Sequence, residues 1–144
     1  MSQRNSFDLQ RFVVAQAPAF DAALKELQSG RKQTHWMWFV FPQMRGLGHS
    51  SQAEFYGIAS LDEARAYLAH ELLGMRLVQC TETVLHTEAS SLYALFGSPD
   101  DMKFKSCMTL FSVAADEPDN LFLEALQRWC DGSLDERTLA LISN

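Results

Sequence analysis

A chain of 144 residues with 47% hydrophobic and 21% charged residues is long enough to form one soluble domain with its own core. Its net charge of −6 disfavours nucleic-acid binding, because proteins of that class normally present a basic face. The longest apolar run is far too short to cross a membrane, and no signal peptide is visible. Three cysteines far apart in the sequence are typical of a reducing compartment, so we expect a cytoplasmic protein.

Helix patterns begin near the N-terminus. Apolar residues spaced as on one helix face predict a helix from Phe20 to Leu27, with Gly30 as its C-terminal stop. A shorter helix is expected over residues 8–16. Pro18 should separate the two, because proline has no backbone N–H and disfavours the helix interior.

The aromatic segment His-Trp-Met-Trp-Phe-Val-Phe-Pro-Gln, residues 35–43, is the most distinctive stretch of the chain. Its four large aromatic side chains point in several directions whether the segment is helical or extended, so it must be enclosed on most sides. Burying one such side chain removes about 150–250 Å² from water. We therefore expect this segment at the centre of the fold, followed by an irregular loop over 43–52.

Residues that favour helix starts and helix ends also occur along the second half of the chain. Ser60 to Glu63 and Ser133 to Glu136 have the pattern of capping boxes, which predicts a helix start at each. Gly74 is expected to interrupt the helices after the first box. Ser98-Pro99-Asp100-Asp101 predicts another helix start. We predict an all-α fold: a compact bundle of six to eight helices around the aromatic segment, forming a single domain over residues 1–144.

Motifs along nearly the whole chain follow a recognisable order. They are residues 35–43 with Gly46-Leu47-Gly48 and Ser50, then residues 62–68 with His70, Leu73-Gly74, Arg76-Leu77, Phe96-Gly97, Pro99-Asp100-Asp101, Lys103 and residues 108–111. This pattern resembles an uncharacterised bacterial family, domain-of-unknown-function family 1810, which carries a calpastatin-like label in some genomes. The resemblance implies an all-helical single domain and no established activity.

Two positions depart from that family pattern, and the calpastatin label has no physical support. Glu71 stands where a proline is expected after His70, and Cys107 stands where a small residue such as serine is expected. An inhibitor that wraps a protease on a disordered chain should contain few aromatic residues. This chain contains 10 Phe, 3 Trp and 3 Tyr, which require a packed core.

Polar residues that the apolar pattern leaves unexplained form the predicted ligand site. We predict His35 as a catalytic general base and Arg76 as the clamp for an anionic group. The other predicted ligand-binding residues are Trp36, Trp38, Gln43, Ser50, Tyr56, His70, Asp101 and Lys103. Indole faces can stack on a planar ring or a sugar.

Most of these residues also have a purely structural interpretation. The Trp and Phe side chains are typical of a core, and His35 of a buried, hydrogen-bonded histidine. Gln43 suits the capping of backbone groups in the loop, and Arg76 suits a partly buried ion pair. Asp101 suits the stabilisation of a helix N-terminus. Cys107 is expected to be buried inside a helix rather than reactive.

Other chemistries lack their sequence signals. The histidines have no zinc-ligand spacing, Gly46-Leu47-Gly48 lacks the rest of a phosphate-loop fingerprint, and no nucleophile elbow is present. We therefore expect no metal and no cofactor. Two functions remain: binding or processing of a small polar ligand, nucleotide- or sugar-like, in an aromatic-walled pocket, or a protein-interaction module without catalytic activity and with an unknown partner. Polar side chains converging on one cleft favour the first function, and an exposed apolar patch favours the second.

Overall fold

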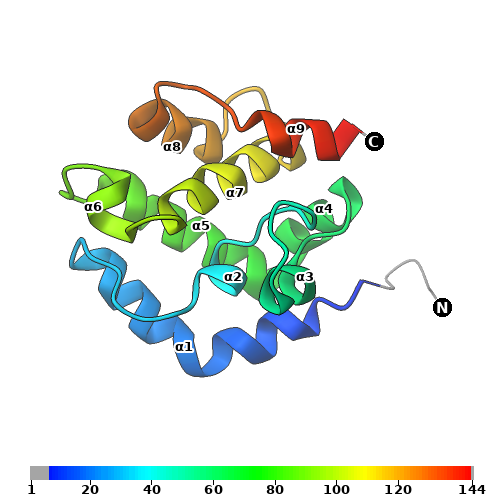
Figure 1. Ribbon diagram of the computed structural model, residues 1–144, viewed down its shortest axis with the longest axis horizontal. Coiled ribbons are helices and arrows are strands. Elements are labelled where there is room, and N and C mark those ends of the chain that lie inside the picture. The colour runs from blue at the N-terminus through cyan, green and yellow to red at the C-terminus, as the bar shows by residue number, and fades with distance from the viewer. Residues whose placement is uncertain (1–6, 144) are drawn as a thin grey trace.

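The computed structural model describes residues 7–143, which form nine helices and contain no β-strand (Figure 1). The helices are α1 (Gln10–Gln28), α2 (Met37–Val40), α3 (Ser51–Tyr56), α4 (Leu61–Ala69), α5 (Glu71–His86), α6 (Leu92–Phe96), α7 (Asp100–Ala114), α8 (Leu121–Cys130) and α9 (Glu136–Ser143). The predicted all-α class is confirmed. The number exceeds six to eight because helices as short as α2 are too short to show apolar periodicity. Within residues 7–143, no helix is both long and apolar enough to cross a membrane.

A single long helix, α1, replaces the two helices predicted around Pro18. Pro18 lies inside α1, and Figure 1 shows this helix bent near its middle. Proline removes one backbone hydrogen bond and crowds the preceding turn, so it commonly bends a helix. Buried side chains on both sides of the proline, Phe12 and Phe20, hold both halves against the core. The predicted break was therefore wrong. The predicted stop at Gly30 is confirmed, and this residue has a φ of 83°.

The boundary between α4 and α5 lies at His70 and not at Gly74, so the predicted interruption was wrong. The Nδ1 atom of His70 accepts a hydrogen bond from the backbone N–H of Leu73 at 3.2 Å and caps α5. Gly74 lies within α5, where a Cβ atom would be 2.2 Å from the carbonyl oxygen of Leu68. Gly74 therefore allows a close approach of α5 to α4 and does not end a helix.

Side-chain caps define the starts of α4 and α9. Ser60 accepts a hydrogen bond from the backbone N–H of Glu63 at 3.1 Å, as the capping box predicts. At α9 the cap is Asp135, whose carboxylate accepts from the backbone N–H of Thr138 at 3.0 Å. The helix start was thus predicted correctly, but Asp135 caps it in place of Ser133.

The aromatic segment lies at the centre of the core, as the sequence predicts. Trp36 and Phe41 are each 1% exposed, and Phe41 packs edge-to-face against Phe104 on α7 with ring centroids 5.1 Å apart. α7 in turn packs against α4, α6, α8 and α9 (Figure 1). Trp38, on the same short segment, remains partly exposed. The segment therefore contributes both to the core and to the surface.

Glu26 on α1 fixes the start of the aromatic segment. Its carboxylate accepts hydrogen bonds from the backbone N–H groups of Gln33 and Thr34, the hydroxyl of Thr34 and the indole N–H of Trp36, over 2.7–3.0 Å. Desolvation by partial burial raises the pKa of Glu26, but the four hydrogen bonds together outweigh it. They lower the pKa from 4.5 to about 2.

Replacing Glu26 with glutamine should therefore destabilise the protein in a pH-dependent manner. Because its pKa is lower in the folded chain, ionised Glu26 stabilises the fold fully above pH 4.5, and this contribution is lost as the pH falls towards 2. Urea unfolding at pH 7 should show a loss of about 1–2 kcal/mol, a range reduced for solvent screening of the partly exposed carboxylate. The difference from the native chain should shrink by pH 3. Glu82→Gln, at an exposed position, is the control, and a pH-independent difference for Glu26→Gln would contradict the assignment.

Candidate ligand-binding site

Three of the predicted ligand-site residues line one cavity of about 350 Å³, named here the Trp38 cavity. Trp38 lies on α2, Gln43 on the loop that follows, and Lys103 near the start of α7. The other lining residues are Leu47, Gly48, Pro99, Met102, Lys105, Ser106, Asp135 and Arg137. The cavity forms where the aromatic segment, the start of α7 and the start of α9 meet, and its volume is within the range of small-molecule sites.

Positive charge dominates the Trp38 cavity. Lys103, Lys105 and Arg137 line it, whereas Asp135 is the one carboxylate among the described lining residues. Lys105 donates to the hydroxyl of Ser133 at 3.2 Å, and Arg137 donates to a backbone carbonyl at 3.4 Å. Neither forms an ion pair with any residue in the described part of the chain. A chain with a net charge of −6 thus concentrates two unneutralised cations at this cavity.

Lys103 is the one cation of the three that forms an ion pair and a cation–π contact among the described residues. Its ammonium lies 3.5 Å from the ring centroid of Trp38 and 3.2 Å from a carboxylate oxygen of Asp100. Asp100 also binds Lys32, at 2.9 Å. The ammonium covers one face of the indole through a cation–π contact. A ligand approaching that face therefore meets a positive charge before it meets the ring.

Two polar side chains at the cavity retain unused hydrogen-bonding groups. One carboxylate oxygen of Asp135 accepts from Ser106 at 3.3 Å and from Thr138 at 3.0 Å, while its other oxygen has no partner among residues 7–143. Gln43 is 9% exposed, and its side-chain amide forms no hydrogen bond within the same range but keeps access to solvent. Both groups are therefore available to a ligand.

Comparison with known proteins places the chain in a family. A family model described as a protein of unknown function, DUF1810, matches residues 6–142. The chain belongs to the DUF1810 family. It is also similar to the conserved hypothetical protein Rv1873 from Mycobacterium tuberculosis, whose crystal structure is known. The two sequences are 51% identical, and the match covers 97% of this chain and 99% of that chain. The two structures superpose with a TM-score of 0.93. No curated protein matches the chain.

The comparisons confirm the family resemblance and the all-helical fold. DUF1810 is defined as a family of unknown function, and Rv1873 is described as hypothetical, so neither supplies a ligand or a reaction. The function of this DUF1810 chain therefore has to be inferred from its own side chains.

Three predicted site residues of this DUF1810 protein pack against other parts of the fold: Trp36 is buried, and Arg76 and Tyr56 are half-buried. Trp36 donates its indole N–H to Glu26 and is 1% exposed. Arg76 lies 4.6 Å from the ring centroid of Phe20 and donates to the amide oxygen of Gln16 at 3.3 Å. Tyr56 packs against neighbouring aromatic rings, including that of Phe39 with centroids 5.4 Å apart. None of the three lines the Trp38 cavity.

Three further predicted residues bind backbone groups near helix starts. Ser50 accepts from the backbone N–H of Ala53 at 3.1 Å and caps α3, and His70 caps α5. Asp101 accepts from the backbone N–H of Met102 at 2.9 Å in the first turn of α7. His35 is exposed and lines none of the cavities described here, so its role as a general base stays a prediction.

Four polar residues of the Trp38 cavity were not among the sequence predictions. Lys105 and Ser106 lie on α7, while Asp135 and Arg137 lie about 30 residues further along, at α9. Asp135 and Arg137 fall outside the motifs that carry the family resemblance. Only the packing of α9 against α7 brings them to the cavity. In the sequence, the closely spaced lysines Lys103 and Lys105 were the available indication of a positively charged site.

Proposed function

We propose that this protein binds a small phosphorylated organic molecule in the Trp38 cavity. The observation that carries the proposal is the concentration of Lys103, Lys105 and Arg137 at one cavity with a single lining carboxylate. Phosphate oxygens are the common small-molecule partners of such clusters, since arginine binds them in a bidentate manner and lysine supplies a compact point charge.

Each part of a sugar phosphate or nucleotide has a chemical partner in this cavity. Arg137 and Lys105 bind the phosphate, because they have no ion-pair partner among the described residues. The free oxygen of Asp135 accepts from a ligand hydroxyl, and the amide of Gln43 can donate or accept. The partly exposed side chain of Trp38 supplies apolar contact. The proposal covers binding and assigns no reaction.

The protein-interaction alternative has no comparable support. Among residues 7–143, the exposed large apolar side chains come from five different helices; they are Val14, Phe55, Met75, Val78, Tyr93 and Met102. Exposed apolar side chains are common at protein surfaces and do not by themselves define an interaction site.

A thermal-shift panel tests the proposed function. The panel contains inorganic phosphate, ribose, ribose 5-phosphate, AMP and ADP-ribose. At least one phosphorylated organic compound should raise the melting temperature, while ribose should not, because only ligands that bind the folded state stabilise it. Arg137→Gln and Lys105→Gln should each weaken binding of the hit by about tenfold. Arg65→Gln removes the same charge at an exposed position away from the cavity and should leave binding unchanged.

Fluorine NMR of protein labelled with 5-fluorotryptophan locates the bound ligand. The chain has 3 Trp, and Trp38→Phe assigns the resonance of Trp38. The ligand should shift this resonance and leave that of buried Trp36 nearly unchanged. No hit in the panel, or a hit bound equally well by both cavity variants, would refute the proposal.

A further inference from the structure

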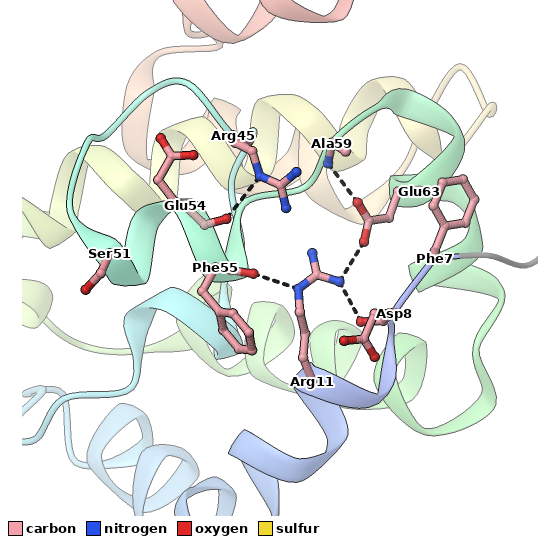
Figure 2. A pocket seen from close by; sticks show the side chains of 9 residues that line it. All are labelled: Phe7, Asp8, Arg11, Arg45, Ser51, Glu54, Phe55, Ala59 and Glu63. Carbon is pink, nitrogen blue, oxygen red and sulfur yellow. Dashed lines mark hydrogen bonds and ion pairs between the residues drawn. The ribbon is translucent and has the colours of Figure 1, made fainter.

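A second cavity, of about 640 Å³, lies where the start of α1, helix α3 and the start of α4 come together (Figure 2). We name it the Arg45 cavity. Two guanidinium groups meet there: Arg11 and Arg45 each donate to the carbonyl oxygen of Gly57 at 3.0 Å. A Cβ atom on Gly57 would lie 2.7 Å from the backbone of Arg45, so glycine permits this close arrangement.

The two arginines differ in how far their hydrogen-bonding groups are used. The side chain of Arg11 is 6% exposed and forms an ion pair with Glu63 at 2.9 Å. Arg45 donates its Nε–H to the carbonyl oxygen of Glu54 at 3.0 Å and one Nη2–H to Gly57. Its Nη1 atom has no hydrogen-bond partner, and no ion pair neutralises Arg45, among the residues that the structure describes.

The free donors of Arg45 face open space in the cavity. Figure 2 shows its guanidinium projecting between α3 and the guanidinium of Arg11, with the carboxylate of Glu54 pointing away. Glu63 already neutralises Arg11, so the exposed Arg45 is the guanidinium with an unpaired charge at this cavity. An oxyanion bound beside Arg45 would neutralise this charge and accept its unused N–H donors.

The remaining walls restrict the kind of anion. Phe55 is 54% exposed and Phe7 lines the cavity with it, so an apolar group of the ligand has aromatic surface to cover. The carboxylates of Asp8, Glu54 and Glu63 outnumber the two arginines that line the cavity, so the lining disfavours a dianion such as phosphate more than a monoanion. A carboxylate carries one charge and matches the planar fork of a guanidinium. We propose that the Arg45 cavity binds a small carboxylic acid with an apolar substituent.

Backbone-amide NMR titration of the full chain with 3-phenylpropionate tests this inference. The ligand should give saturable shifts in α3 and around Arg45, with a Kd of about 1 mM or lower. The neutral isostere 3-phenylpropionamide should not bind. Inorganic phosphate should bind this cavity at least about tenfold more weakly than 3-phenylpropionate.

Variants identify the groups that bind the acid. Arg45→Gln should weaken binding by about tenfold or more, and Arg65→Gln should not change it. Since Arg45 also binds the loop backbone, Phe55→Ala provides a second variant that keeps these backbone contacts; it should weaken binding by about threefold or more. Any of four results would overturn the inference. They are the absence of saturable binding of 3-phenylpropionate, equal binding of the amide, tighter binding of phosphate, and undiminished binding by both Arg45→Gln and Phe55→Ala. These outcomes do not depend on the Trp38 cavity.

Discussion

Replacing Gly74 with alanine is expected to lower the free energy of unfolding by at least about 3 kcal/mol. In an ordinary helix interior this substitution stabilises by roughly 0.5–1 kcal/mol, because glycine has the larger conformational entropy to lose. At Gly74 the new Cβ atom would lie 2.2 Å from the carbonyl oxygen of Leu68. A backbone atom cannot yield as a flexible side chain does, so α4 and α5 would have to separate.

Urea unfolding followed by circular dichroism measures this effect. Met75→Ala is the matched control in the same helix, since Met75 is 58% exposed. It should change stability by less than about 0.5 kcal/mol. A Gly74→Ala chain that is as stable as the native one would show that α4 and α5 do not approach as closely as the structure indicates.

Replacing Glu63 with alanine is expected to cost about 3–5 kcal/mol, because it leaves a buried arginine without its counter-ion. The side chains of Arg11 and Glu63 are 6% and 3% exposed, and their charged atoms lie 2.9 Å apart. The second carboxylate oxygen of Glu63 accepts from the backbone N–H of Ala59 at 2.7 Å. Loss of Glu63 therefore removes both an ion pair and a backbone hydrogen bond near the start of α4.

A double-mutant cycle measured by urea unfolding separates these contributions. Glu63→Ala combined with Arg11→Met should cost clearly less than the sum of the two single changes, because the double variant contains no unpaired buried charge. Glu54→Ala, at an exposed position nearby, should change stability by less than about 0.5 kcal/mol. A cost below about 1 kcal/mol for Glu63→Ala would show that the pair is solvated.

The two cavities differ in their electrostatic character. Arg45 lies among the carboxylates that line its cavity, whereas Lys105 and Arg137 line a cavity with one carboxylate. This difference leads to separate ligand classes, a monoanionic acid at the first and a phosphorylated molecule at the second. Both proposals are tested by removing one positive charge at a time, with Arg65→Gln as the common control.

The sequence predicted the features that depend on neighbouring residues. Ser60 caps α4 at the helix start that its spacing from Glu63 indicates, and Gly30 follows the end of α1. Four large aromatic residues within six positions were sufficient to predict a central segment, since no single helix or strand face holds them all. These inferences succeeded because caps, stops and side-chain direction are determined over a few residues.

The helix boundaries that were predicted wrongly from proline and glycine have their explanation in tertiary packing. Pro18 does not end α1, because buried residues on both sides hold the bent helix to the core. Gly74 does not break α5, because it is required for contact with Leu68. Proline and glycine indicate a local conformational preference of about 1–3 kcal/mol. Packing contacts that contribute several kcal/mol can override this preference.

The candidate site shows the same division between sequence and tertiary structure. Aromatic and polar residue types selected Trp38, Gln43 and Lys103, but gave no reason to join them to Asp135 and Arg137. Packing of α9 against α7 makes that connection. The sequence by itself determined the helical class, the family and the central aromatic segment, since these follow from local pattern. Only the tertiary structure decided which charges share a cavity, because that depends on contacts between segments far apart in the chain.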